Sequence, residues 1–198
     1  MSQPRPSPVT VESGELGEFS RDERTLLLRV AHESIVAALE DRQIPLDAPT
    51  AHLSEPRGVF TSLHLRGELR GCVGYVLPVS PVYRAVAETA RAAAFEDARF
   101  YPVTLPEACD LEIELSILSL PQPISPEAVE VGRHGLLISM AGLRGLLLPQ
   151  VPVEHHWDRA KFLEQTCRKA GLPVDAWKHG AAIEAFTAEV FGDEQTLK

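Results

Sequence analysis

The clearest pattern along the chain is an alternation of apolar and polar residues over residues 111–118. In the run LEIELSIL every odd position is apolar, and the even positions up to 116 carry glutamate or serine. A period of two predicts a strand with one face on the core and the other in water. Residues 58–65 alternate in a similar way and, together with residues 69–76, predict a β-hairpin.

Apolar residues at helical spacing predict three helices. The first, over about residues 21–40, begins with the capping box SRDE, in which the serine and the glutamate each satisfy backbone groups of the other. The second is alanine-rich, is opened by Ser-Pro at 80–81 with serine as the N-cap, and ends near residue 96. The third is expected over about residues 158–170, where a following glycine ends it.

The second half of the chain repeats the order of elements in the first half. Residues 135–140 and 143–149 predict another hairpin, joined at Ala141-Gly142, and one last strand is expected within residues 181–191. The return strand of each hairpin carries the tripeptide LRG, at 69–71 and at 143–145, and each leads into Leu-Pro. The shared order of elements indicates an internal duplication.

We therefore expect an α+β protein: antiparallel sheet with flanking helices, built from duplicated strand–strand–helix–strand units that form two lobes, plus an N-terminal helix. Repeat 1 spans about residues 58–120 and repeat 2 about residues 134–192. Residues 1–18 are rich in Pro, Ser, Gly and Glu and predict a flexible tail. The remaining residues, 19–198, form a single domain.

Composition and charge exclude several classes of protein. The chain has 198 residues and a net charge of 19 − 28 = −9, which disfavours binding to nucleic acid. No apolar run reaches the roughly 20 residues of a membrane span, and the N-terminus lacks the features of a signal peptide. Three cysteines cannot form a disulfide framework, so we expect a cytoplasmic protein with reduced thiols.

The stretch ELRGCVGY at 68–75 raises the main chemical question, because a cysteine lies there between two glycines. If residues 66–68 form a three-residue loop, residue 65 pairs with 69, 63 with 71 and 61 with 73. This register places Cys72 beside Arg70 on the face away from the core. A two-residue loop would break the grouping, since a slip of one residue exchanges the two faces of a strand.

Two interpretations of Cys72 stay open. A neighbouring cation favours the thiolate, which is the nucleophilic form, and Gly71 and Gly74 would let a ligand approach closely. Free cysteines are also among the most buried residues, so packing is an equally ordinary role. For Cys109, before a strand, and Cys167, on an inner helix face, burial is the better expectation.

Two carboxylates are weaker candidates for acid–base chemistry. Glu114 lies on the wet face of the strand over 111–118, and Asp97 follows the alanine-rich helix. Either could act as acid or base if it lined a cleft. Glu114 is otherwise a solvated side chain, and Asp97 a helix-end partner of Arg99. The adjacent pair His155-His156 cannot place both rings on one face, so we expect no metal site.

In this arrangement the sequence resembles the AMMECR family, whose microbial members are called AmmeMemoRadiSam system protein A. LRGCVG is similar to the family's hallmark, usually LRGCIG, and DARF is similar to its DPRF block with Ala98 in place of proline. The matching blocks, in family order between about residues 20 and 192, are LRGCVGY, DARF at 97–100, LEIELSIL, VGRHGL at 131–136, GLLLPQV at 145–151 and CRKAGLP at 167–173.

The resemblance implies the duplicated α+β fold and no settled reaction. We expect no intrinsic cofactor. The resemblance also implies action with two other proteins, one Memo-like and similar to non-haem iron dioxygenases, the other a radical SAM protein. The chain would then be an accessory or substrate-handling component; the alternative is an enzyme that uses Cys72 as thiolate nucleophile beside Arg70. The residues carried over to a site near a cleft are Leu69, Arg70, Gly71, Cys72, Gly74, Asp97, Arg99 and Phe100.

Overall fold

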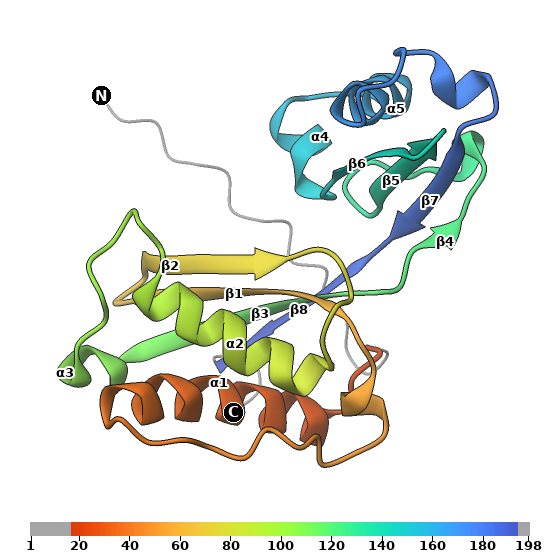
Figure 1. The fold of residues 1–198 in the computed structure, drawn as a ribbon. Helices are drawn as coiled ribbons and strands as arrows, with labels where there is room; N and C mark the ends of the chain where they lie inside the picture. Colours follow the sequence, from red (N-terminus) through yellow and green to blue (C-terminus); the bar gives the residue numbers. More distant parts are fainter. Residues whose placement is uncertain (1–16, 194–198) are drawn as a thin grey trace, which may run out of the picture.

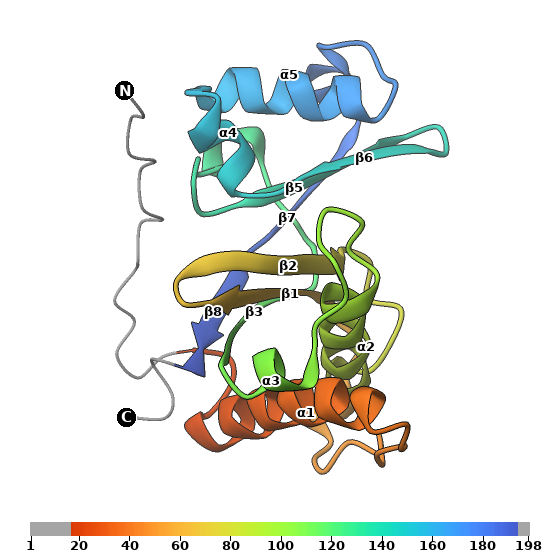
Figure 2. The same cartoon turned by 90° about the vertical axis from the view of Figure 1, so that its left-hand side faces the viewer.

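The computed structural model describes residues 17–193, which form two lobes (Figure 1). Each lobe has a four-stranded antiparallel sheet with helices on one face. In Figure 2 the helices lie on the outer sides of the molecule and the bare faces of the two sheets are turned toward each other. The expected α+β fold with two lobes and an N-terminal helix is confirmed. No helix in residues 17–193 is long and apolar enough to cross a membrane.

The first lobe contains sheet 1, in the strand order β2-β1-β3-β8. Its helices are α1 (Arg21–Leu39) and α2 (Val82–Phe95), which pack on the same face and on each other. A 3-10 turn (His52–Ser54) and the short α3 (Leu105–Ala108) complete it. The strands are β1 (Gly58–Leu65), β2 (Glu68–Tyr75), β3 (Leu111–Leu118) and β8 (Ala188–Gly192).

The second lobe contains sheet 2, in the strand order β4-β7-β5-β6, covered by α5 (Arg159–Lys169). A short helix, α4 (Gln150–Glu154), precedes α5, and 3-10 turns lie at Pro126–Ala128 and Ala176–Lys178. The strands are β4 (Gln122–Pro123), β5 (Gly135–Met140), β6 (Leu143–Leu147) and β7 (Ala182–Phe186). The buried side chains of the two lobes form two separate apolar clusters.

After its third strand, each repeat sends one further strand into the sheet of the other lobe. Within each repeat the order is the same, β2-β1-β3 and β6-β5-β7, but the chain then continues from β3 into β4 of sheet 2 and from β7 into β8 of sheet 1. The run 181–191 is therefore two strands in different sheets, not the single strand that its pattern predicts. At the crossing, the Ser119 N–H donates to the Thr187 carbonyl (2.9 Å), so a two-stranded ribbon joins the lobes.

The predicted capping box is present at the start of α1. The Ser20 hydroxyl accepts from the Glu23 N–H (3.3 Å), and the Glu23 carboxylate accepts from the Ser20 N–H (3.0 Å). The predicted cap of α2 is wrong by one residue, since Pro81 is the N-cap and makes no side-chain cap bond. The predicted tail falls outside the described residues except at its end, where the Glu18 N–H donates to Glu189 (2.6 Å).

The first hairpin does not have the predicted three-residue loop. Leu65 pairs with Glu68, so the turn contains only Arg66 and Gly67, both with positive φ (54° and 80°), as a two-residue hairpin turn requires. The pairing of 65 with 69 is therefore wrong. One extra residue, Arg70, then forms a β-bulge that restores the predicted pairs 63 with 71 and 61 with 73. Because of this bulge Cys72 keeps the predicted face, whereas Leu69 moves off the core face.

A glycine in each LRG tripeptide lets a helix approach the sheet closely. A Cβ atom on Gly71 would lie 2.1 Å from the Ala93 carbonyl oxygen near the end of α2. A Cβ atom on Gly145 would lie 2.2 Å from the Ala170 nitrogen at the end of α5. The tripeptide recurs with the same physical role for its glycine, which supports the duplication.

Candidate functional site

Cys72 lies on the face of sheet 1 that the helices leave uncovered. It pairs with Ser62 on β1, and Ser62 pairs in turn with Glu114 on β3, so these three side chains form one row across the sheet. The Ser62 hydroxyl donates to the Cys72 sulfur at 3.3 Å. Cys72 and Ser62 are half-buried, and Glu114 is exposed. The row thus offers a thiol, a hydroxyl and a carboxylate on the face of sheet 1 that is turned toward the second lobe.

Asp97 and Arg99 hold the backbone of Cys72 on the outer side of β2, which is an edge strand. The Asp97 carboxylate accepts from the Cys72 N–H (2.9 Å), and the Arg99 guanidinium donates to the Cys72 carbonyl (3.3 Å). Both backbone groups point away from β1, so Cys72 and Ser62 form a non-hydrogen-bonded pair, whose side chains approach most closely. The DARF turn therefore occupies the place of a further strand and fixes the sulfur beside the hydroxyl.

The same contacts make Asp97 unsuitable as a proton donor or acceptor. Hydrogen bonds from Arg99, and then from the Cys72 N–H, hold the pKa of the Asp97 carboxyl far below its usual range. The carboxylate binds the Arg99 side chain at 2.9 and 2.7 Å, and only 7% of its surface is exposed. Phe100 lies under the guanidinium, with the Arg99 carbon 5.4 Å from the ring centre. Asp97 and Arg99 therefore position the backbone of Cys72.

Arg70 is bound on the same edge but to a different segment. From the bulge its guanidinium donates to the Glu107 carboxylate (3.1 and 3.2 Å) and to the carbonyls of Tyr101 (2.8 Å) and Pro102 (3.3 Å). The bond from Arg70, with bonds from Thr104, lowers the pKa of Glu107 to about 2. The guanidinium that contacts Cys72 is that of Arg99, not that of Arg70.

The remaining residues of the hallmark motif have distinct surroundings. Gly71 lies under α2, and a Cβ atom on Gly74 would come within 2.5 Å of the Phe60 ring. At both positions close packing leaves no room for a side chain. Leu69 is 41% exposed and pairs with His64 on the uncovered face. In the neighbouring row, His64 lies between Leu69 and Glu112 and is not paired with Arg70.

The other cysteines and the histidine pair have no part in this surface. Cys167 is fully buried in the second lobe, and burial raises the pKa of its thiol. Cys109 is exposed, so its expected burial is wrong. His155 stacks on Trp157, with 4.8 Å between ring centres. Among residues 17–193 there is no group of three or more side chains that could hold a metal ion.

Two residues that matter for the site were missed from the sequence. Ser62 could have been found, because the correct pairing of 63 with 71 also sets 62 opposite 72. Glu107 gave no local signal, since it meets Arg70 only through the fold of the segment between α2 and β3.

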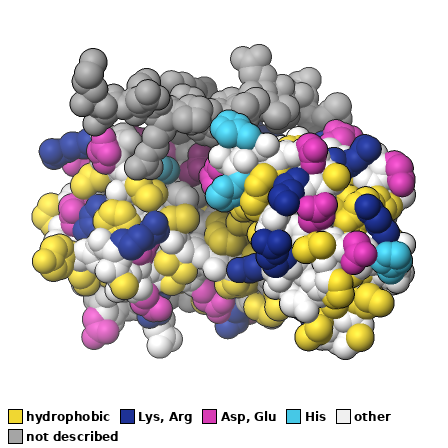
Figure 3. Space-filling model, turned by 90° about the horizontal axis from the view of Figure 1, so that it is seen from above, with side chains coloured by type: hydrophobic (Ala, Val, Ile, Leu, Met, Phe, Trp, Pro, Cys, Tyr) yellow, Lys and Arg dark blue, Asp and Glu magenta, His cyan; other side chains and the backbone are white. Residues whose placement is uncertain are grey.

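Figure 3 shows acidic and basic side chains interspersed over the side of the molecule seen from above, with no large patch of one sign.

Comparison with known proteins places the chain among uncharacterised relatives. The AMMECR1 family pattern matches residues 28–191. A protein of Thermofilum pendens is 39% identical over 197 residues, covering 89% of this chain and 92% of its own, and Protein MK0488 of Methanopyrus kandleri is 41% identical over 193 residues, covering 91% and 93%. The crystal structure of an uncharacterized protein, PH0010, from Pyrococcus horikoshii matches with a TM-score of 0.64 at 38% identity, over 86% of this chain and 91% of that one. The chain therefore belongs to the AMMECR1 family.

Proposed function

We propose that the protein is an accessory, substrate-handling component that presents the uncovered face of sheet 1 to a partner. One observation carries the proposal: both arginines of the motif blocks are bound within the protein. Arg70 binds Glu107 and two carbonyls, and Arg99 binds Asp97 and the carbonyl of Cys72. Two guanidinium groups that are bound in this way hold the shape of the protein surface, whereas donors that stabilise a transition state point at the place where its charge develops.

The distance between the possible reacting groups supports the same proposal. Glu114 stands two strands away from Cys72, which is about 10 Å at the usual strand spacing. A general base must come within about 3 Å of the proton that it removes. Asp97, which does reach the strand, is held ionised by Arg99. The Ser62 hydroxyl, which donates to the Cys72 sulfur, is a weak base and cannot replace such a carboxylate.

The expected partners follow from the family resemblance: a Memo-like protein and a radical SAM protein. The test is retention of both, from the same organism, on the immobilised full chain. We expect Glu114→Arg to abolish retention, because Glu114 is exposed in the middle of the face. The matched control is Asp47→Arg, the same kind of charge reversal on an exposed loop after α1. Equal retention by both variants, or none by the wild type, would contradict the proposal.

A second function is supported by a specific contact and remains an alternative: an enzyme that uses Cys72 as a thiolate nucleophile. The Ser62 hydroxyl donates to the sulfur, and the Arg99 guanidinium is bound to the same residue. A hydrogen-bond donor and a cation both favour thiolate over thiol. In this alternative Arg99 would take the role first expected for Arg70.

Alkylation of the native protein by iodoacetamide across pH, followed for each cysteine peptide, separates the two proposals. Exposed Cys109 and buried Cys167 are internal references for an accessible and an inaccessible thiol. An accessory protein should show Cys72 reacting between these two references. Reaction of Cys72 faster than Cys109 below neutral pH would mark an activated thiolate and favour the enzyme.

A further inference from the structure

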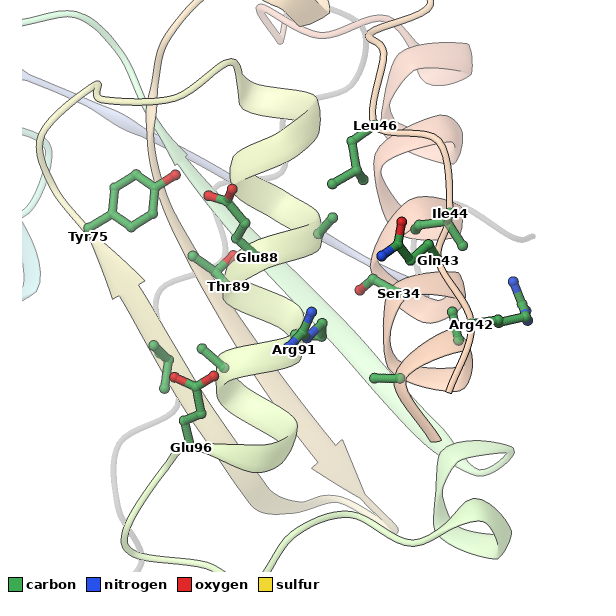
Figure 4. Close-up of a pocket in the computed structure, with 15 residues that line it drawn as sticks. Ser34, Arg42, Gln43, Ile44, Leu46, Tyr75, Glu88, Thr89, Arg91 and Glu96 are labelled. Atoms are coloured by element: carbon green, nitrogen blue, oxygen red, sulfur yellow. The ribbon is translucent and has the colours of Figure 1, made fainter. Parts of the chain in front are cut away.

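A hollow in the described part of the chain lies on the opposite side of sheet 1 from the Cys72 sulfur. It has a volume of about 560 Å³ and lies between α1, the loop that follows it, α2 and the edge of β2 (Figure 4). Small-molecule sites in proteins commonly measure about 300–1,000 Å³. The hollow is therefore large enough for a ligand, and it shares no side chain with the row of Cys72, Ser62 and Glu114.

Small side chains on two packed helices create this hollow. Ala37 and Ala38 of α1 and Ala87 and Ala92 of α2 line it, so the helices leave space where larger residues would fill it. The loop after α1 supplies the outer wall, with Ile44 and Leu46 packed against the first apolar cluster. The part between α1, α2 and this loop is thus an apolar slot.

Charged groups are divided between the two sides of α2. Figure 4 shows Glu88, Glu96 and Tyr75 on the side of β2, whereas Arg91 lies at the edge of α2 that faces α1 and the loop, which carries Gln43. An anionic ligand would be repelled on the β2 side. On the slot side it would meet a guanidinium and an amide at the mouth of an apolar channel.

Arg91 is available for such a ligand. The second arginine at the slot, Arg42, is bound to Glu40 (2.6 Å) and Glu33 (3.5 Å). Arg91 has no hydrogen bond or acidic partner within residues 17–193, and it is exposed. A free guanidinium offers paired N–H donors that match the oxygens of a carboxylate or a phosphate.

We propose that this slot is a ligand site for an amphipathic small molecule with an apolar body and one anionic head, a carboxylate or a phosphate. The apolar body lies along the alanines of α1 and α2 against Ile44 and Leu46. The head lies at the mouth and accepts hydrogen bonds from Arg91. The site is independent of the function proposed for the uncovered face of sheet 1.

Calorimetric titration of the full chain tests the site with three probes of equal chain length: octanoate, octyl phosphate and octanol. Ligands of this size reach dissociation constants of about 1 mM or tighter in a good site. We expect saturable binding of octanoate, octyl phosphate or both, and the preferred head identifies the source of the natural ligand. Octanol binding as tightly as both anions would overturn the proposal, as would no saturable binding of any probe.

Three variants locate the binding. Arg91→Gln should weaken binding at least about tenfold, because a hydrogen bond to a charged group is lost. Arg84→Gln is the matched control, since Arg84 is also exposed on α2 but does not line the hollow. Ala38→Leu should fill the slot and weaken binding of every probe while the melting temperature stays within a few degrees. Equal affinities for the Arg91 and Arg84 variants would overturn the assignment.

Discussion

The two lobes share one plan, and one pair of side chains on their uncovered sheet faces shows a difference between them. Leu63 opposite Gly71 in sheet 1 corresponds to Ile138 opposite Gly145 in sheet 2. One step along, the first lobe pairs Ser62 with Cys72, where the second pairs Leu137 with Leu146. Both pairs lie on the face away from the helices. A polar pair has therefore been kept in one lobe at a position where an apolar pair is also compatible with the fold.

The difference extends to the backbone around these pairs. In the second lobe Arg144 pairs regularly with Ser139, whereas the first lobe makes Arg70 a bulge that binds Glu107. The first lobe also holds its edge strand with Asp97 and Arg99, and β6 has no such ion pair among the described residues. The order of strands and helices is common to both lobes. The bulge at Arg70 and the Asp97–Arg99 pair, which fix side-chain positions, occur in the first lobe.

The largest effect is expected where the lobes are alike. Gly71→Ala and Gly145→Ala should each lower the free energy of unfolding by about 3 kcal/mol, because a Cβ would overlap helix backbone in both lobes. Chemical denaturation followed by circular dichroism measures this. The matched controls are Gly67→Ala and Gly142→Ala at the hairpin tips, where nothing lies within 4 Å and only the positive φ costs about 1 kcal/mol. A core variant no worse than its control would mean that the helices shift freely.

The second largest effect should be found in the first lobe and not in the second. Asp97→Ala removes the acceptor of the Cys72 N–H and the partner of Arg99, so we expect a loss of about 1 to 2 kcal/mol at pH 7. Asp47→Ala, at an exposed loop position, should change stability by less than about 0.5 kcal/mol. Hydrogen exchange should show the extra opening in β2 and not in β6. Equal protection of β2 in variant and wild type would contradict the positioning role.

The pH dependence of the same variant gives an independent reading. Because the pKa of Asp97 is lowered on folding, its stabilisation is present above the unfolded value near 4 and is lost as pH falls through the folded value. Glu107 behaves likewise down to about 2. The stability gap between wild type and Asp97→Ala should therefore be constant above about pH 5 and shrink as the pH falls from there toward pH 2. A gap that is constant with pH would show that the charge of Asp97 is irrelevant.

The helices and strands of the two lobes could be predicted because their apolar residues recur at the regular spacing of a strand or a helix. Alternation over 111–118 and helical spacing after SRDE matched β3 and α1 closely. The pattern could not predict that residues 181–191 divide between two sheets, since a strand that crosses between lobes keeps its alternation. Crossing of strands between sheets is a property of tertiary packing, which leaves no local signal.

The site was predicted less well because its contacts are distant along the chain. The face of Cys72 was right only because two errors compensated: the turn is one residue shorter, and the bulge at Arg70 adds one back. The bulge depends on Glu107, 37 residues away, and the clamp on Cys72 depends on Asp97. Periodicity cannot detect such pairs, whereas residue identity marked both arginines as members of the motif.

The smallest effect tests whether the polar pair is there for folding at all. Cys72→Ala should cost less than about 1 kcal/mol, because the half-buried thiol gives up one weak hydrogen bond and little apolar area. Leu146→Ala, at the corresponding half-buried position of the second lobe, removes more apolar surface and should cost about 1 to 2 kcal/mol. Both are measured by the same denaturation experiment.

The order of these two costs decides what the pair means. If Cys72→Ala is cheap for folding yet weakens retention of the partner proteins, the thiol is kept for the surface that it forms. If it costs as much as Leu146→Ala, Cys72 is a packing residue, and the two pairs are equivalent solutions of one structural need. The first result would place the specific chemistry of the molecule in the lobe where Asp97 and Arg99 fix the strand, and would leave the second lobe as its apolar counterpart.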